Sequence, residues 1–359
     1  MQKKLYMMLR KISFLLKNRG LSWCLYRGFY EFFNLKVPAT LAKALSYEKE
    51  RNGLDNIVML KTPDGSQQAV HPDVVCWKKH HYLVVTPYPY GIDLYENPII
   101  YVYANEKWNY CAGSCVLPDY KKNCHLSDPC FSIINNSLYL YYRQSLKGKN
   151  KKNWIYRVNV NDKGGLSERK LIFLSETEDF ISPAVVEKDD EYIMFYVNKL
   201  SEDRTKLFIR RSIEGEKWGP PEEVEVGNMP PNCCIWHLSV GYSTGLSKQR
   251  RKYDKCIHGI FTLFNFVERR YENFYSIQES CVLRWRILSR IKIPNRIEKE
   301  LLTEYKTTIF WNNNNKYLLV SGQDINMKWR IYEIEVEQSN IEVEHSNFRI
   351  EEYNGDNQI

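Results

Sequence analysis

The chain has 359 residues, of which 43% are hydrophobic and 14% aromatic, and this composition excludes a disordered protein. The formal net charge is +8, but residues 1–36 hold eight Lys and Arg against one Glu, so the rest of the chain is close to neutral. A nucleic-acid-binding body would need a basic face of its own, and no later segment has a comparable density of basic residues. We therefore expect no nucleic-acid partner.

Residues 1–50 predict a basic amphipathic helical segment. The stretch "LYMMLRKISFLLKNRGLSWCLYRGFYEFFNLK" has apolar residues at helical spacing, basic residues at polar positions and many aromatic residues. Such a segment either lies on an anionic membrane surface or packs its apolar face on the following domain. No cleavable export signal and no run of 18 apolar residues is evident. We expect a cytoplasmic chain or, as the alternative, one held peripherally at the inner face of the membrane through residues 1–36.

The ten cysteines are expected to be reduced thiols, since no export signal precedes them. Cys111, Cys115, Cys124 and His125 lie close together in the chain, but their spacing matches no common zinc pattern. No phosphate-binding loop, dinucleotide fingerprint or HExxH motif is present. We expect no metal ion and no cofactor.

Five related segments lie between residues 51 and 359. They are "HPDVVCW" from His71, "SDPCFSII" from Ser127, "SPAVVEK" from Ser182, "WHLSVGYS" from Trp236 and "KTTIFWN" from Lys306. Each reads as a short apolar strand that is followed by a second strand rich in Tyr, Phe or Leu, and then by a third. Three or four strands in each unit of about 55 residues are typical of a β-propeller. Residues 51–359 therefore predict an all-β, five-bladed β-propeller, preceded by the short α-helical N-terminal segment.

The starts of these segments are the candidate site. The first strand of each blade would line the central channel, and its start would lie at the channel mouth. Asp128 and Pro129 break the local rules of a strand together, which is typical of functional sites, and a proline at a strand start costs no ladder hydrogen bond. The catalytic candidates are Asp73, Glu96 and Asp128. The candidates for substrate binding are His71, Tyr88, Ser182, Trp236 and His237.

On "HPDVV", "SDPCF", "SPAVV" and their spacing, residues 55–335 resemble the five-bladed propeller glycosidases of glycoside hydrolase families 43 and 32. The resemblance implies an Asp on the first blade as general base and an Asp before a Pro on the second blade that orients the acid. It also implies a Glu on the third blade as general acid. Asp73 and Asp128 correspond to the two Asp positions, whereas Ser182 stands where the acid is expected.

Because of Ser182, we expect the acid to come from elsewhere. Glu96 in "YENP" is the first candidate, and Glu178 or Asp179 before "FISP" is the second. The prediction is thus a glycoside hydrolase-like protein that cleaves a glycan or glycolipid with paired carboxyl groups.

Two alternatives stay open. A non-catalytic glycan-binding propeller would result from loss of the third-blade acid. A membrane-associated accessory protein or transferase of bacterial surface-polysaccharide assembly would use the basic N-terminal segment. A propeller that only binds proteins explains the repeats but not the acids at their starts. The sequence does not specify the oligomeric state.

Overall fold

A computed structural model describes residues 57–58, 60–62, 65–116, 124–146, 151–201, 203–242, 257–312, 315–324 and 328–336. The expected helical segment, residues 1–50, lies outside the described residues, and so does the basic stretch 247–255. Within the described ranges, no helix is both long and apolar enough to cross a bilayer.

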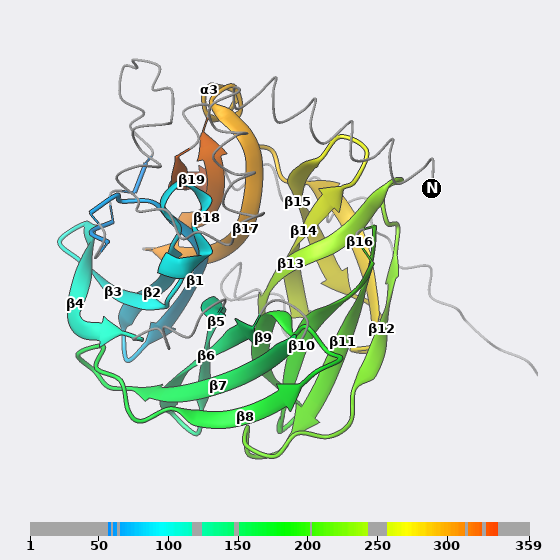
Figure 1. The fold of residues 1–359 in the computed structure, drawn as a ribbon, viewed down its shortest axis with the longest axis horizontal. Helices are drawn as coiled ribbons and strands as arrows, with labels where there is room; N and C mark the ends of the chain where they lie inside the picture. The colour runs from blue at the N-terminus through cyan, green and yellow to red at the C-terminus, as the bar shows by residue number, and fades with distance from the viewer. Residues whose placement is uncertain are drawn as a thin grey trace, which may run out of the picture.

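The described chain is nearly all-β and consists of consecutive antiparallel meanders (Figure 1). The first sheet holds β1 (Ala69–Trp77), β2 (His80–Pro87), β3 (Ile99–Ala104) and β4 (Lys107–Cys115). The second sheet holds β5 (Cys124–Ile134), β6 (Ser137–Leu146), β7 (Lys152–Val160) and β8 (Lys170–Ser175). The short helices are η1 (Pro89–Gly91), η2 (Asp93–Tyr95) and α3 (Asn295–Glu298).

The next two meanders share one eight-stranded sheet. The strands of the first are β9 (Ile181–Lys188), β10 (Glu191–Ser201), β11 (Arg204–Ser212) and β12 (Glu222–Gly227). The strands of the second are β13 (Cys233–Tyr242), β14 (Ile257–Asn265), β15 (Arg270–Gln278) and β16 (Arg284–Arg290). Their outer strands, β12 and β16, pair in parallel and join the two meanders.

The last sheet uses residues from both parts of the chain. It holds β17 (Leu301–Asn312), β18 (Asn315–Asp324) and β19 (Trp329–Val336). Ile57 forms an antiparallel bridge with Tyr332, and the N–H of Val58 donates to the carbonyl of Ile331 at 2.8 Å. Residues 57–58 therefore lie alongside β19 at the edge of this sheet.

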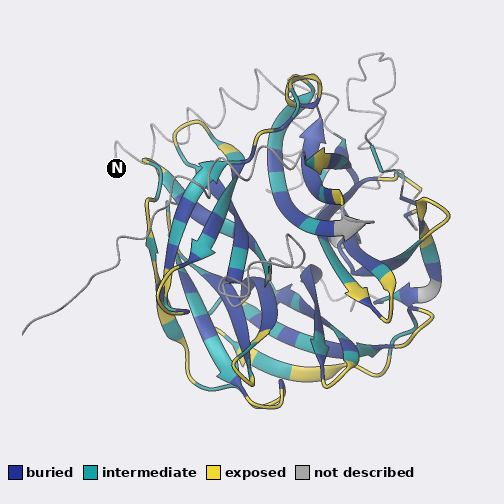
Figure 2. Cartoon of the chain, turned by 180° about the vertical axis from the view of Figure 1, so that it is seen from behind, coloured by how far each residue is buried: buried dark blue, intermediate teal, exposed yellow. Residues whose placement is uncertain are grey.

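The meanders surround a central axis. The first strands contact one another in a closed cycle, β1 on β5, β5 on β9, β9 on β13, β13 on β17 and β17 on β1 (Figure 1). An apolar cluster fills each interface between consecutive meanders, and Trp285 and Phe261 are almost fully buried in one of them. Exposed residues gather at the loops (Figure 2). Burial of these sheet faces is the main favourable term for the ring.

Two-residue turns set the register of several first hairpins. Asn135 and Asn136 connect β5 to β6 with φ values of 49° and 61°, and Asp189 and Asp190 connect β9 to β10 with 51° and 64°. Two successive residues of positive φ are the conformation that matches the twist of a hairpin, and Asn and Asp tolerate it well. These polar turns are the ones that the sequence predicts between the first and second strands.

A β-bulge interrupts the first strands at corresponding positions. His71, Asp128 and Ser182 each precede a proline and have φ values of 57°, 54° and 53°. The pairing register shifts around all three. A bulge leaves one residue out of the ladder of hydrogen bonds between the strands, so a proline there costs no hydrogen bond. The bulge also redirects the neighbouring side chain. The left-handed conformation costs about 1 kcal/mol or more for a residue other than glycine. The unusual "SDP" of the sequence is thus a bulge.

Candidate functional site

A pocket of about 380 Å³ opens where the bulges of the first strands meet. Its wall is rich in charged and aromatic side chains. The carboxyl groups are those of Asp93, Glu96, Asp128 and Asp179. The basic and imidazole groups are those of His71, His125, Arg143, Lys151, Lys199 and His237. The aromatic groups are those of Tyr88, Trp236 and Tyr305.

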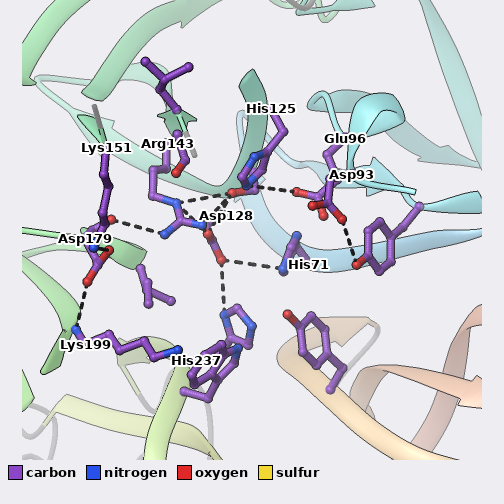
Figure 3. Close-up of a pocket in the computed structure, with 17 residues that line it drawn as sticks. His71, Asp93, Glu96, His125, Asp128, Arg143, Lys151, Asp179, Lys199 and His237 are labelled. Atoms are coloured by element: carbon purple, nitrogen blue, oxygen red, sulfur yellow. Dashed lines mark hydrogen bonds and ion pairs between the residues drawn. The ribbon is translucent and has the colours of Figure 1, made fainter. Parts of the chain in front are cut away.

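Asp128 lies at the centre of this constellation and is 1% exposed (Figure 3). Its Oδ2 lies 3.2 Å from Nε of Arg143 and accepts from the Ser127 hydroxyl at 2.9 Å. Its Oδ1 lies 3.1 Å from Nδ1 of His237 and 3.6 Å from Nε2 of His71. Burial raises the pKa of Asp128, but the Arg143 guanidinium and the contact with His237 outweigh it, so that the net pKa is well below the usual value. Asp128 is therefore an ionised carboxylate.

Both histidines that face Asp128 are neutral. Burial lowers the pKa of His71 and of His237, and this outweighs the opposing effect of Asp128. Nearby Lys306 and Arg143 lower both values further. Nδ1 of His71 lies 2.9 Å from the hydroxyl oxygen of Thr86. The charge of Asp128 is balanced by Arg143 and not by an imidazolium.

Arg143 comes from β6, where it pairs directly opposite Ser127. It donates to the Ser127 hydroxyl at 3.2 and 3.3 Å and to the carbonyl of Asp179 at 3.2 Å. The sequence analysis did not select it. The available signal was a lone arginine in the aromatic strand "SLYLYYRQS", since a buried cation needs an acidic partner.

Glu96 and Asp93 come from the loop between β2 and β3 and lie together on one side of Asp128 (Figure 3). Glu96 is 6% exposed, and its Oε2 lies 3.9 Å from Nε2 of His125. The Tyr88 hydroxyl donates to Asp93 at 3.2 Å. The N–H of Leu126 donates to the carbonyl of Glu96 at 3.2 Å, which fixes the loop to β5.

Asp179 lies on the opposite side of Asp128, just before β9 (Figure 3). It forms an ion pair with Lys151 and accepts from the N–H of Lys199 at 3.2 Å. Its own N–H donates to the side-chain oxygen of Asn198 at 2.9 Å. The pocket thus presents carboxyl groups on two opposing walls.

Aromatic rings complete the pocket. The ring of Tyr305 lies 4.5 Å from that of His237 and 5.3 Å from that of His71, measured between centroids. Burial raises the pKa of Tyr305 well above its usual value, so its hydroxyl is protonated. Trp236 stands beside His237 on β13. Sequence analysis missed Tyr305 because it began the fifth repeat one residue later, at Lys306.

The structure brings six of the eight candidates from the sequence to this pocket. They are His71, Tyr88, Glu96, Asp128, Trp236 and His237. Asp73 and Ser182 do not line it. Asp73 accepts from the N–H of Phe131 at 2.7 Å, and the hydroxyl of Ser182, which is fully buried, donates to the carbonyl of Leu238 at 3.1 Å. Both side chains link neighbouring first strands.

The position of Asp73 leads to a pH-dependent stability. Burial raises its pKa to about 6, against the opposing effects of Lys306 and the N–H of Phe131. Because the folded value lies above the unfolded one, the folded state binds this proton more tightly, so this contribution falls as the pH rises from about 4 to about 6. Asp73 keeps some solvent contact, so we expect a change of only about 1–2 kcal/mol.

Urea denaturation of wild type and Asp73→Asn between pH 4 and 7.5 measures this contribution. The difference in unfolding free energy, wild type minus variant, should increase towards pH 4. Asn can still accept from Phe131, and exposed Glu168→Gln is the matched control. A difference that is constant across this range would contradict the assignment.

The comparisons with known proteins agree with this architecture. No protein-family model matches the chain. No curated protein is similar to it in sequence. Solved structures that are similar in fold include the following three. The first is a thermostable family-43 glycoside hydrolase, with 12% identity, a TM-score of 0.55, and coverage of 75% of this chain and 90% of that one.

The second is a xylan β-1,4-xylosidase from Bacillus halodurans C-125, with 12% identity and a TM-score of 0.57. The similarity covers 75% of this chain and 53% of the xylosidase. The third is a family-32 β-fructofuranosidase from Bombyx mori, with 12% identity, a TM-score of 0.53, and coverage of 83% and 65%. The similarity at these identities is one of fold, and it confirms the predicted propeller fold.

Proposed function

We propose that the five meanders are five blades of a propeller and that the chain binds a glycan in the pocket around Asp128 and cleaves it by acid–base catalysis. The observation that carries this proposal is the arrangement of Glu96 and Asp179 on opposite walls of one pocket, with Asp128 between them. Cleavage of a glycosidic bond needs two carboxyl groups that flank it. The similarity of the fold to that of known glycosidases supports the same substrate class.

The surroundings of each carboxyl group suggest its role. Asp128 is ionised and its Oδ2 is held by Arg143 and Ser127, so we propose that it organises the pocket and transfers no proton. Asp179 is paired with Lys151 on the other wall of the pocket, and we assign it the role of base or nucleophile. Glu96 lies on the wall opposite Asp179 and faces the imidazole of His125, so we assign the proton donor to Glu96.

The aromatic side chains supply the binding surface. Trp236 and Tyr305 line the pocket next to His237. Flat aromatic faces bury apolar area, while their polar edges hydrogen-bond, a combination that suits a sugar ring. Asp73 and Ser182 have no part in this proposal, because neither lines the pocket.

Non-catalytic glycan binding is the second candidate. It is favoured by Ser182, which stands where the family pattern implies the acid and uses its hydroxyl on the backbone of Leu238. A link to bacterial surface polysaccharide rests on the sequence of residues 1–36 alone, which also carry the proposed peripheral membrane contact.

A glycan panel separates the two candidates. Purified protein is incubated with neutral and acidic oligosaccharides, new reducing ends are measured by chromatography, and binding is measured by calorimetry. The proposal expects release of reducing ends from at least one glycan. Binding without release would support the second candidate. Neither binding nor release across the panel would contradict both.

A further inference from the structure

We propose that His71, Asp128 and His237 form a binding site for a divalent transition-metal ion, with zinc as the best-fitting ion, at the base of the pocket. The proposal is argued from these three side chains alone and does not depend on whether the pocket cleaves a glycan. Among the described residues these three form a group whose ligand atoms all lie within 4.8 Å of one another.

The spacing of the ligand atoms suits a small ion. Zinc binds imidazole nitrogen and carboxylate oxygen at about 2.0–2.1 Å, so two ligands of a tetrahedral site are about 3.3 Å apart. Oδ1 of Asp128 lies 3.1 Å from Nδ1 of His237 and 3.6 Å from Nε2 of His71. These two distances lie on either side of the tetrahedral value, and the three ligand atoms together lie within 4.8 Å of one another.

Unsatisfied polar atoms point to a missing ligand. Nε2 of His71 and Nε2 of His237 are buried and have no hydrogen-bond partner among the described residues, while Oδ1 of Asp128 and Nδ1 of His237 face each other at 3.1 Å without the geometry of a hydrogen bond. The three residues are only 3%, 1% and 2% exposed, in chain order. Buried polar groups are normally satisfied, and each exception needs an explanation. One cation would satisfy an atom of each residue at once.

The groups behind His71 and Asp128 fix the orientation of these two ligands. Thr86 lies at hydrogen-bond distance from Nδ1 of His71, which leaves Nε2 directed towards Asp128. Ser127 and Arg143 hold Oδ2 of Asp128 and leave Oδ1 directed towards the histidines. Such outer contacts are the usual support of metal ligands, because they set the tautomer and the ring orientation.

The charges around the site limit its affinity and define its selectivity. Arg143 and Lys306 both act electrostatically on the two histidines, and their positive charges oppose a cation. We therefore expect micromolar and not nanomolar binding of zinc. Two nitrogen ligands and one carboxylate suit zinc, cobalt or nickel, whereas calcium and magnesium require mostly oxygen ligands. Three protein ligands beside an open pocket leave one coordination position for water or substrate.

The sequence alone predicted no metal, because the three ligands come from β1, β5 and β13, which are far apart in the chain. No short motif connects them. Only the closed cycle of first strands brings them together.

Chelator-treated full-length protein provides the test, in the absence of any glycan. Isothermal titration with Zn²⁺ should give one ion per chain, and Co²⁺ should give the visible absorption of a four- or five-coordinate ion. X-ray absorption at the zinc edge should report two imidazoles. Ca²⁺ should give no binding at the same concentrations. Because no glycan is present, failure here leaves the proposed glycan cleavage untouched, and failure of cleavage leaves this result untouched.

Single substitutions of the proposed ligands test whether these residues hold the ion. His237→Ala and His71→Ala should each weaken Zn²⁺ binding by about 100-fold or more, which exceeds the 10–100-fold effect of losing an outer contact. Exposed His80→Ala is the matched control and should bind as wild type does. Circular dichroism checks that the variants fold. Absence of Zn²⁺ and Co²⁺ binding to wild type would overturn the proposal, and so would equal binding by both histidine variants or equal binding of Ca²⁺.

Discussion

Replacement of Glu96 by Gln is expected to reduce glycan cleavage by about 10²–10⁴-fold, which is the usual contribution of a general acid or base. Gln has the same shape and can occupy the same space beside His125, but it cannot donate or accept the proton of the reaction. The backbone contact between Glu96 and Leu126 is unaffected by the change, so the loop should stay in place. The change should therefore act on kcat and leave the dissociation constant for the glycan within about threefold.

The measurement pairs initial rates with calorimetric affinities for the glycan that the panel identifies. Glu168→Gln is the matched control, since Glu168 is exposed and distant from the pocket lining. Asp179→Asn should also lose cleavage if this residue supplies the second carboxyl group. Full activity of Glu96→Gln would remove Glu96 from the mechanism, whereas loss of affinity without loss of kcat would reassign it to binding.

Replacement of Asp128 by Asn should destabilise the fold by about 3 kcal/mol, because it leaves the Arg143 cation without its carboxylate in a buried site. Truncation of one partner of a buried pair typically costs about 3–5 kcal/mol. Arg143 keeps its bonds to Ser127 and to the carbonyl of Asp179, so we expect the lower end of that range. Chemical denaturation at pH 7 measures the change.

A double-mutant cycle distinguishes this cause from a general loss of packing. Addition of Arg143→Met to Asp128→Asn removes the unpaired cation and should recover part of the lost stability. Asp162→Asn is the control, because Asp162 pairs with Lys78 on the surface with 66% of its side chain exposed. Its loss should cost less than about 1 kcal/mol. If Asp128→Asn lowers the free energy of unfolding by no more than Asp162→Asn does, the buried pair of Asp128 and Arg143 does not stabilise the pocket.

The sequence revealed the strand repeats and several of the residues at their starts. Asp128 and His237 could be identified from the sequence because each stands at the head of a repeat, and the first strands of the repeats converge on the central axis. Asp73, by contrast, was expected at the pocket but does not line it. In a regular strand, side chains two residues apart lie on the same face, so His71 and Asp73 would both reach the pocket. The bulge between Val70 and Asp73 breaks this alternation, and Asp73 instead binds the backbone of the neighbouring strand.

The positions of Arg143 and Tyr305 in the pocket depend on the register in which neighbouring strands pair, and a single sequence does not specify that register. Arg143 reaches Asp128 because β6 places it opposite Ser127. The bulge that follows Ser127 shifts the pairing register of β5 against β6. Tyr305 lies in the corresponding register shift of β17. Segments 1–50 and 337–359 lie outside the described residues, so the helical N-terminal segment stays a prediction.

The parallel pairing of β12 with β16 has a mechanical consequence. Asp179, Lys199, Trp236 and His237 all belong to the half of the molecule that this pairing unites, so these groups keep their mutual spacing when a ligand enters. His71 and Glu96 belong to the part of the chain around the β1–β4 sheet, and Asp128 belongs to the β5–β8 sheet, which packs on that half through an apolar cluster. We expect any adjustment to a ligand to occur as sliding at the interfaces between sheets. The contact of Asp128 with His237 crosses one of these interfaces and connects the two sides.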